Sequence, residues 1–321
     1  MSITQPPMKL DSASIGAFVR DLEHKERELD RIEYPDLPFA EGKIVPIQFI
    51  NDPIATTTRY HQVTNVGSFA LIRNYSTVLP NIDLLTREFT QNIHKWGAKY
   101  FYTEEDVLSF ARSGISLPQE KIAGVMEAAK QQMNKLIAFG DSTIGMPGFL
   151  NHPDCFKSEA AYAINLTTTS EQQLSVLNDA VNFIPRYTKN LEKPDTMLLP
   201  LSVYQYLSNL PYTVANTGLM GKTVLQHFRE SNAYIKNIIG LTELEADSLS
   251  QYGLPARPAM VVYNRNITKL KTKVFKNVGF HQPRPVQGSI DAYERPATFK
   301  MAGVELRRPY SMHIVELPQS A

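Results

Sequence analysis

Two short segments of the sequence imitate motifs that carry out chemistry in enzymes, and the first contains a candidate nucleophile. Residues 136–143 (LIAFGDST) hold the Gly-Asp-Ser triplet that certain serine esterases use, in which Ser142 would attack an ester. Those esterases place the serine after a strand near the chain start, and a late Asp-x-x-His supplies the acid and the base. Here the triplet follows a predicted helix, and no histidine after Ser142 has an aspartate three residues before it. A hydrolase built on Ser142 is therefore a remote alternative, and Gly140 is better explained as the end of a helix.

The second segment ends like a phosphate-binding loop and would use Lys222. Residues 216–223 (NTGLMGKT) match the end of G-x-x-x-x-G-K-[ST], but Asn216 stands where the first glycine belongs. A side chain there would occupy the turn at which the backbone must approach the phosphates. Residues 212–214 are also a poor match for the long buried strand that precedes such a loop. We interpret the segment as a glycine-rich surface loop whose lysine contacts a neighbouring subunit, and nucleotide hydrolysis stays a remote alternative.

The other polar residues form no local catalytic or metal-binding pattern. The histidines are scattered, without a His-x-x-x-His pair or a nearby cysteine; they are His24, His61, His94, His152, His227, His281 and His313. We therefore predict no catalytic residue, no cofactor and no metal ion. Lysines alternate along one strand-like stretch, at Lys269, Lys271, Lys273 and Lys276. This alternation allows a basic stripe for nucleic acid, but a solvated strand face is the favoured interpretation.

Composition excludes several classes of protein. The 321 residues include 43% apolar and 20% charged side chains, as in folded proteins, and the net charge is +1. Without a global basic field, contacts with nucleic acid must be local or weak. The single cysteine, Cys155, cannot form an intrachain disulfide, which indicates a reducing compartment. The start lacks the apolar core of a signal peptide, and no run of about 18 apolar residues is present, so we expect no contact with membranes.

The elements that would position these residues begin with a segment that lacks a core of its own. Residues 11–33 have the apolar spacing of a surface helix. Four prolines within residues 34–53 prevent a helix and indicate an extended arm. Residues 56–62 and 68–75 are predicted to be the strands of a hairpin that turns at Asn65-Val66-Gly67. Because an isolated hairpin is marginally stable, roughly the first 80 residues should need surfaces from elsewhere in this chain or from other copies.

A long strand and two helices are predicted next. Residues 82–102 alternate as a strand, and Thr103 should cap a helix whose first turn is acidic. Residues 117–139 form the clearest helix, with one apolar stripe along a length of about 35 Å. Ser116 should open this helix with a capping box, and Gly140 should end it.

After residue 166 the pattern changes to short helices and strands. Helices are predicted at 170–184, 202–208 and 222–230, and strands at 196–199, 234–239 and 259–263. Together they predict an α/β module at about 167–264. Residues 267–316 are mostly strand-like, so the fold class is α+β.

The order of these pieces and several local motifs resemble one protein family. The motifs are the strand end Trp96-Gly97-Ala98-Lys99-Tyr100-Phe101-Tyr102-Thr103, the loop Gly145-Met146-Pro147-Gly148-Phe149-Leu150-Asn151, and Thr196-Met197-Leu198-Leu199-Pro200 followed by Tyr204 and Leu207. Over nearly its whole length, the chain resembles the encapsulin-related branch of tailed-bacteriophage major capsid proteins. The resemblance implies a Hong Kong 97-type capsid fold. Its parts would be an N-terminal arm, an E-loop hairpin, a P-domain with a long spine helix, and an α/β A-domain.

The resemblance also implies domain boundaries and a function. The N-arm would be residues 1–53, the E-loop 54–80, the P-domain 81–165 with 267–321, and the A-domain 166–266. The implied function is structural and not enzymatic: a major capsid subunit that self-assembles through pentamers and hexamers into an icosahedral shell enclosing phage double-stranded DNA. The residues expected at contacts between subunits are Arg59, Tyr60, Phe69, Arg73 and Lys222.

Partners and location follow from the same resemblance. Only about 50 residues precede the E-loop, so a separate scaffolding protein is implied, together with a portal and, in some shells, a decoration protein. DNA would be met through weak local contacts, and the protein would be made in the host cytoplasm and reside in the virion. The alternative is an encapsulin, a nanocompartment shell that encloses an enzyme cargo, whose peptides residues 11–33 could bind.

One departure from the founding member of this fold concerns covalent cross-linking. That member joins its subunits by lysine-to-asparagine isopeptide bonds, which need an amine on the E-loop. This sequence has no lysine between Lys43 and Lys95, and Arg59 and Arg73 stay protonated at neutral pH. We therefore expect a shell without such bonds.

Overall fold

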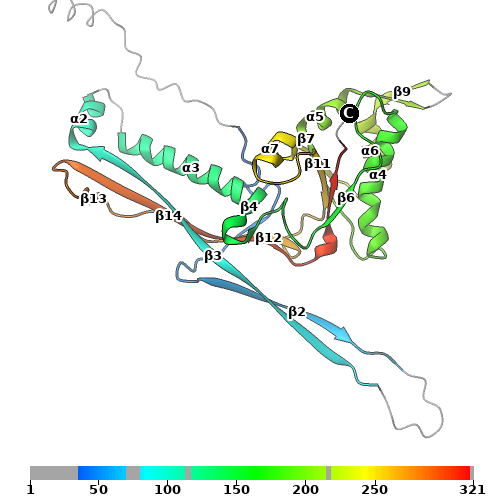
Figure 1. The fold of residues 1–321 in the computed structure, drawn as a ribbon, viewed down its shortest axis with the longest axis horizontal. Helices are drawn as coiled ribbons and strands as arrows, with labels where there is room; N and C mark the ends of the chain where they lie inside the picture. Colours follow the sequence, from blue (N-terminus) through cyan, green and yellow to red (C-terminus); the bar gives the residue numbers. More distant parts are fainter. Residues whose placement is uncertain (1–34, 70–79, 113–116, 215–217, 319–321) are drawn as a thin grey trace, which may run out of the picture.

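A computed structural model of the chain describes residues 35–69, 80–112, 117–214 and 218–318. It consists of a long sheet with one helix laid along it, an α/β lobe at one end, and a ribbon that projects from the body (Figure 1). The helix predicted at 11–33 lies outside the described residues.

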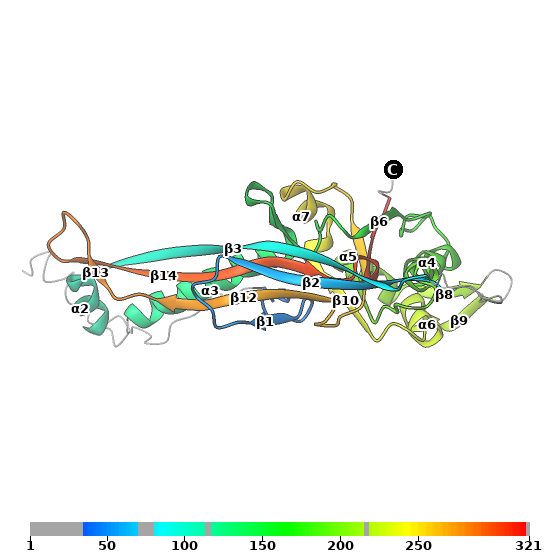
Figure 2. The same cartoon turned by 90° about the horizontal axis from the view of Figure 1, so that it is seen from below.

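The long sheet is built on one very long strand, as the alternation of residues 82–102 predicted. Strand β3 (Asp83–Thr103) pairs antiparallel with β14 (Ala292–Leu306), from Thr103 opposite Ala292 to Ile93 opposite Ala302. Beyond β14 follow β12 (Leu270–Phe280) and, in parallel, β1 (Ile47–Phe49); the short β13 (Arg284–Pro285) also pairs with β14. The long strands run side by side along the molecule in Figure 2.

The first half of β3 has a different partner, and this corrects the predicted hairpin. Strand β2 (Thr57–Val66) pairs antiparallel with it, from Thr57 opposite Asn92 to Val66 opposite Asp83. The chain therefore does not turn at Asn65-Val66-Gly67. That triplet has the composition of a tight turn, but the longer β3 offers more cross-strand pairs than residues 68–75 could. Residues 70–79, which hold most of the predicted second strand, lie outside the described residues.

Both predicted helices after β3 are confirmed. Helix α2 (Glu104–Arg112) begins at Thr103, whose hydroxyl accepts the Asp106 N–H at 3.1 Å, while the Asp106 carboxylate accepts the Thr103 N–H at 3.2 Å. These hydrogen bonds hold the pKa of Asp106 below its ordinary value. Helix α3 (Leu117–Phe139) has the predicted bounds and ends at Gly140. Ser116, its predicted cap, lies outside the described residues.

The loop that follows α3 folds back onto the end of the helix. Its elements are β4 (Gly140–Asp141), η1 (Ser142–Ile144) and β5 (Met146–Pro147). The N–H groups of Phe149 and Leu150 donate to the carbonyls of Ile137 and Ala138, both at 2.8 Å, which satisfies the helix end. Gly140 has φ +68°, and a Cβ at Gly148 would lie 2.2 Å from the Gly140 nitrogen. The two glycines are required because the backbones touch.

The lobe contains a second sheet, and all the helices and strands predicted within it are present. Its strand order is β10 (Asn237–Leu241), β7 (Thr196–Pro200), β11 (Ala259–Tyr263), β15 (Met312–Glu316) and β6 (Phe156–Glu159). Around it lie α4 (Ser170–Tyr187), α5 (Leu201–Asn209), α6 (Val224–Ser231), α7 (Ala246–Gln251), η2 (Thr242–Leu244), η3 (Pro309–Ser311) and the hairpin of β8 (Pro211–Val214) with β9 (Gly218–Thr223). Two of the sheet strands, β6 and β15, come from outside residues 167–264.

The segment before β1 is part of the core of this same chain, where the sequence predicted an extended arm that needs surfaces from elsewhere. Phe39, Ile44 and Val45 are fully buried in the cluster that joins α3 to both sheets. The Phe39 N–H donates to Asn134 Oδ1 at 2.9 Å, and Tyr263 Oη donates to the Ile44 carbonyl at 2.8 Å. Prolines exclude helix here, but they leave the intervening apolar side chains free to pack.

Candidate assembly surfaces

The ribbon formed by β2 and the first half of β3 is the surface most in need of a partner. It extends away from the body, and its outer part is paired only with itself (Figure 1). The large apolar side chains of this part are exposed: Val63 by 57%, Val66 by 47%, Leu84 by 63% and Leu85 by 56%. A two-stranded ribbon without a packed face is marginally stable in water. An external surface must therefore contribute to its stability.

The candidate contact residues on the ribbon are in different situations. Arg59 is exposed, but its guanidinium lies 3.2 Å from the Glu88 carboxylate on the neighbouring strand, so it already has a partner within the ribbon. Tyr60 stacks on Phe89, with 5.0 Å between the ring centroids, and is half-buried. Phe69 is 95% exposed. Arg73 lies outside the described residues.

Lys222 lies at the far end of the molecule, on the β8–β9 hairpin. Its ammonium forms an ion pair with Glu230 on α6. Residues 218–223 are an antiparallel strand, with Gly221 at φ +70° and Thr223 capping α6 through Gln226. A phosphate loop would instead wrap its backbone N–H groups around one point. Residues 218–223 therefore form a strand and a helix cap.

A cluster of buried charges lies beneath the inner end of the ribbon, where the sequence predicted a solvated face. Lys273 Nζ lies 2.6 Å from Glu305 Oε2, and the two side chains are 7% and 1% exposed. The Arg307 guanidinium binds the other oxygen of Glu305. Lys271 is also buried; burial, followed by the charge of Arg307, lowers its pKa. Of the alternating lysines, Lys271 and Lys273 are buried and Lys269 and Lys276 are half-buried, which corrects the expectation of a solvated strand face.

This cluster contacts the ribbon directly. Lys273 Nζ donates to Thr58 Oγ1 at 3.0 Å, and the Arg307 guanidinium lies 5.0 Å from the centre of the Tyr60 ring. Burial, and then the negative charge of Glu305, raise the pKa of Tyr60. Sequence reasoning missed the cluster because its lysines lie on β12, whereas Glu305 lies on β14 and Arg307 just after it. The only available signal was the regular spacing of the lysines, which does not reveal their partners.

A second apolar surface lies at the opposite end of the long sheet. A cleft of about 680 Å³ opens between α2 and the β13 region and is lined by Tyr102, Glu104, Val107, Leu108, Gln282, Pro283 and Tyr293. Tyr102 and Tyr293 stack with 5.8 Å between their centroids. Leu108, which borders the cleft, is 65% exposed. The cleft thus combines an apolar lining with the acidic first turn of α2.

The Gly-Asp-Ser segment acts as a turn and shows no catalytic geometry. The Asp141 carboxylate accepts the Thr143 N–H at 3.0 Å and the Thr143 hydroxyl at 2.6 Å, which caps the turn η1. The hydroxyl bond holds the pKa of Asp141 below its ordinary value. Ser142 is exposed on this turn. The structure therefore accounts for Asp141 as a cap.

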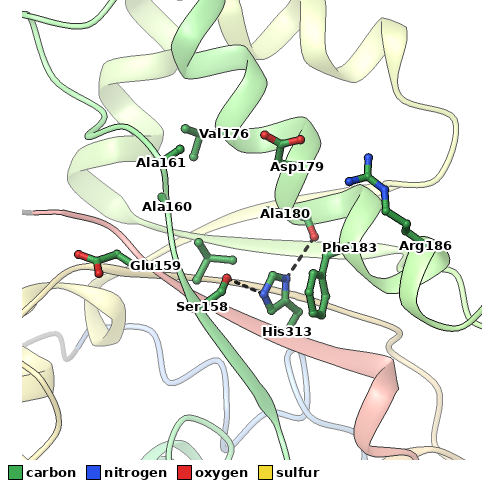
Figure 3. A pocket seen from close by; sticks show the side chains of 11 residues that line it. Ser158, Glu159, Ala160, Ala161, Val176, Asp179, Ala180, Phe183, Arg186 and His313 are labelled. Atoms are coloured by element: carbon green, nitrogen blue, oxygen red, sulfur yellow. Dashed lines mark hydrogen bonds between the residues drawn. The ribbon is translucent and has the colours of Figure 1, made fainter.

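A serine and a histidine do meet elsewhere, in a pocket that the sequence did not predict (Figure 3). Ser158 Oγ lies 2.8 Å from His313 Nε2, while His313 Nδ1 faces the Ala180 carbonyl at 3.4 Å. The imidazole stacks on Phe183 with 4.0 Å between centroids, and burial lowers its pKa. The histidine joins β15 to β6 and α4. Its contacts on every side indicate a packing role, and its partners are too distant in sequence to have been recognised.

Within the described ranges, no three His, Cys, Asp or Glu side chains are grouped so that they could hold a metal ion. None of the described helices has the length and apolar character needed to cross a membrane.

Comparison with known proteins identifies the family and the fold. The family model described as "Major capsid protein" matches residues 67–316. Among curated proteins, none matches the chain significantly. The capsid of Myoviridae phage XM1 is similar in structure, with a TM-score of 0.75 at 16% identity over 93% of this chain and 98% of the other.

Two further solved structures are similar over most of their length. A chain from Mycobacterium phage Bobi has a TM-score of 0.63 at 12% identity, covering 98% of this chain and all (100%) of the other. A virus-like particle from Pyrococcus furiosus has a TM-score of 0.50 at 11% identity, covering 85% and 91%. At these identities the likeness is one of fold.

Proposed function

The chain belongs to the major capsid protein family and has a Hong Kong 97-type fold, and from this premise we propose that its copies assemble through pentamers and hexamers into an icosahedral shell around phage double-stranded DNA. The subunit is a structural protein of a tailed-phage shell, and its place is the virion. The observation that carries the proposed assembly is the ribbon, whose apolar side chains have no cover within the described chain.

From the same premise we assign the parts of a capsid subunit to the elements of this structure. The region before β1 would be the N-arm. Phe39, Ile44 and Val45 anchor its last residues in the core. The E-loop would be the ribbon, so that its second strand extends from Asp83 to about Asn92. The long sheet with α3 as its spine would be the P-domain, and the lobe, including β6 and β15, the A-domain.

Other partners are proposed from the same premise. A separate scaffolding protein and a portal would be needed for assembly, and a decoration protein could add contacts on the outside. Contact with DNA would be local, because the net charge is +1, Lys269 and Lys273 are held in ion pairs, and Lys271 is buried. Synthesis would take place in the host cytoplasm.

The alternatives have less support. The higher TM-scores belong to phage proteins, at 0.75 and 0.63, against 0.50 for the Pyrococcus particle, which favours a phage shell over a cellular nanocompartment. A hydrolase has no support from Ser142, which sits on a capped turn, or from Lys222, which pairs with Glu230.

The deciding experiment is electron microscopy and sedimentation velocity of the purified full-length chain. Rings of five or six copies, or closed shells, are expected. A stable monomer at high concentration, with the ribbon resistant to protease, would contradict the proposal.

A further inference from the structure

The contacts that pack His313 also fix the direction of each nitrogen in its ring. His313 Nδ1 faces the Ala180 carbonyl at 3.4 Å, and Nε2 lies 2.8 Å from Ser158 Oγ. A carbonyl oxygen can only accept a hydrogen bond, so Nδ1 carries the ring proton and Nε2 is left as an acceptor. The Ser158 hydroxyl therefore donates to Nε2 (Figure 3). In this arrangement a histidine can take the proton of a serine nucleophile.

The imidazole of His313 is held neutral and in one orientation. The residue is 2% exposed, and Phe183 stacks on the ring with 4.0 Å between the centroids. Burial lowers the pKa of His313 below its ordinary value of 6.5, so at neutral pH the ring is uncharged and Nε2 can receive a proton. The Ala180 carbonyl fixes the tautomer and the orientation of the ring, as the third member of a catalytic triad does.

The Ser158 hydroxyl borders a pocket whose size admits a small molecule. The pocket has a volume of about 310 Å³ and is formed by β6, the segment after it, α4 and β15. Ser158 is half-buried, and its side chain makes no other hydrogen bond with any residue that the structure describes. Its oxygen is therefore free to meet an atom held in the pocket. Most of the wall is apolar, from Ala160, Ala161, Val176, Phe183 and Val315.

The charges around the pocket suit a neutral substrate that becomes negative during attack. The Glu159 carboxylate is already held by Arg257 at 2.7 Å. Asp179 and Arg186 lie on the α4 wall, seven residues or about 10 Å apart along the helix, and within the described chain neither forms an ion pair. The carboxylate of Asp179 repels an anionic substrate. Arg186 is the only cation among the lining side chains, so it stabilises negative charge that develops on a substrate oxygen.

We propose that Ser158 is a nucleophile and His313 its general base, and that the pocket binds a short neutral ester whose acyl group Ser158 accepts. Ser158 Oγ forms a bond with the carbonyl carbon while its proton passes to His313 Nε2. The bond from that carbon to the ester oxygen then breaks, and the leaving alcohol takes the proton from His313. Water, giving a proton to His313, then attacks the acyl-serine, releases the acid and restores the hydroxyl. The pocket lies within one subunit, so this chemistry does not depend on the proposed shell.

A fluorophosphonate probe tests the nucleophile directly, because an activated serine displaces its fluoride. The purified full-length chain, as free subunits, should be labelled at Ser158, and tandem mass spectrometry of the digested chain locates the label. Ser158→Ala should lose this label, while the control Ser142→Ala, altered at an exposed turn, should keep it. An unlabelled Ser158 in the wild type, or equal labelling of Ser158 after denaturation in urea, would overturn the proposal.

The role of His313 has a separate readout. With p-nitrophenyl acetate, the wild type should release at least one nitrophenolate per chain, and Ser158→Ala should not. His313→Gln should be acylated about a hundredfold more slowly, because glutamine can hydrogen-bond to Ser158 but cannot take its proton. A cooperative thermal transition above the assay temperature shows that each variant is folded, and the label on the wild type decides the role of Ser158 even if His313→Gln unfolds. Equal acylation of the wild type and folded His313→Gln would overturn the histidine as the base.

Discussion

The ammonium of Lys273 lies 2.6 Å from the carboxylate of Glu305, and both side chains are almost completely buried beneath the ribbon. Arg307 holds the same carboxylate from its other side. Because Lys273 also donates to Thr58, this ion pair fixes the ribbon to the body at its inner end. The direction in which the outer ribbon projects from the body therefore depends on these buried charges.

Removing one member of this cluster should be costly. Glu305→Ala leaves two cations near each other without their shared carboxylate, and we expect a loss of about 3–5 kcal/mol in the free energy of unfolding. Denaturant titration followed by circular dichroism measures it. Glu88→Ala breaks the exposed pair with Arg59 and should change stability by less than about 1 kcal/mol. Equal effects of the two substitutions would show that burial of the cluster has been overestimated.

The contact between Gly140 and Gly148 predicts a severe effect of one methyl group. In Gly148→Ala the new Cβ would lie 2.2 Å from the Gly140 nitrogen and 2.4 Å from the Phe139 carbonyl carbon. We expect destabilisation of about 3 kcal/mol or more, because backbone atoms cannot move aside as a side chain can. Gly124→Ala, within α3 and with open space around it, is the control and should raise stability by about 0.5–1 kcal/mol. A stable Gly148→Ala protein would contradict the close approach.

Stability should fall in mild acid through His313. Burial lowers its pKa in the folded subunit from the ordinary value of 6.5, so below that value the unfolded chain binds a proton that the folded chain does not. The contribution of neutral His313 to the free energy of unfolding is complete above pH 6.5 and is lost as the pH falls. As the pH falls from 7.5 to 5.5, the free energy of unfolding should therefore decrease less for His313→Gln than for the wild type. His61→Gln, at an exposed position of the ribbon, is the control, and an unchanged slope for His313→Gln would refute the assignment.

Truncation should distinguish the two parts of the N-terminal region. Removing residues 1–34 should leave a cooperative thermal transition, since the described core begins at Phe39. Removing residues 1–53 also deletes Phe39, Ile44, Val45 and strand β1, and we expect that transition to be lost or to move down by more than 10 °C, as for other losses of several buried side chains. A folded subunit after the longer deletion would mean that this segment adds no stability.

Mature particles should contain no covalent cross-links between lysine and asparagine. The ribbon has no lysine, because none occurs between Lys43 and Lys95, and Arg59 is held by Glu88. Denaturing gel electrophoresis should give one band near 36.2 kDa. Ladders that survive boiling and reductant would contradict this prediction.

Local pattern was sufficient wherever an element is decided by neighbouring residues. The apolar stripe and Gly140 predicted α3 with its bounds, and the acidic turn after Thr103 predicted α2. The alternation of residues 82–102 predicted β3, because a strand with long side-chain alternation has few other solutions. The motif Gly145–Asn151 indicated the family, and its physical basis is the packing of Gly148 against the helix end.

Pairing and burial were decided only by the tertiary structure. The turn signal at Asn65-Val66-Gly67 was overridden because β2 found a longer partner in β3, far along the chain. The lysines of β12 were expected in water, yet Lys273 is buried, since its counter-charge Glu305 lies on a strand that sequence spacing cannot bring close. Likewise, Phe39 and Ile44 between prolines belong to the core because Asn134 and Tyr263 hold their backbone. Sequence records which side chains prefer burial or pairing, while the partner depends on contacts between distant segments, whose free energy no local pattern contains.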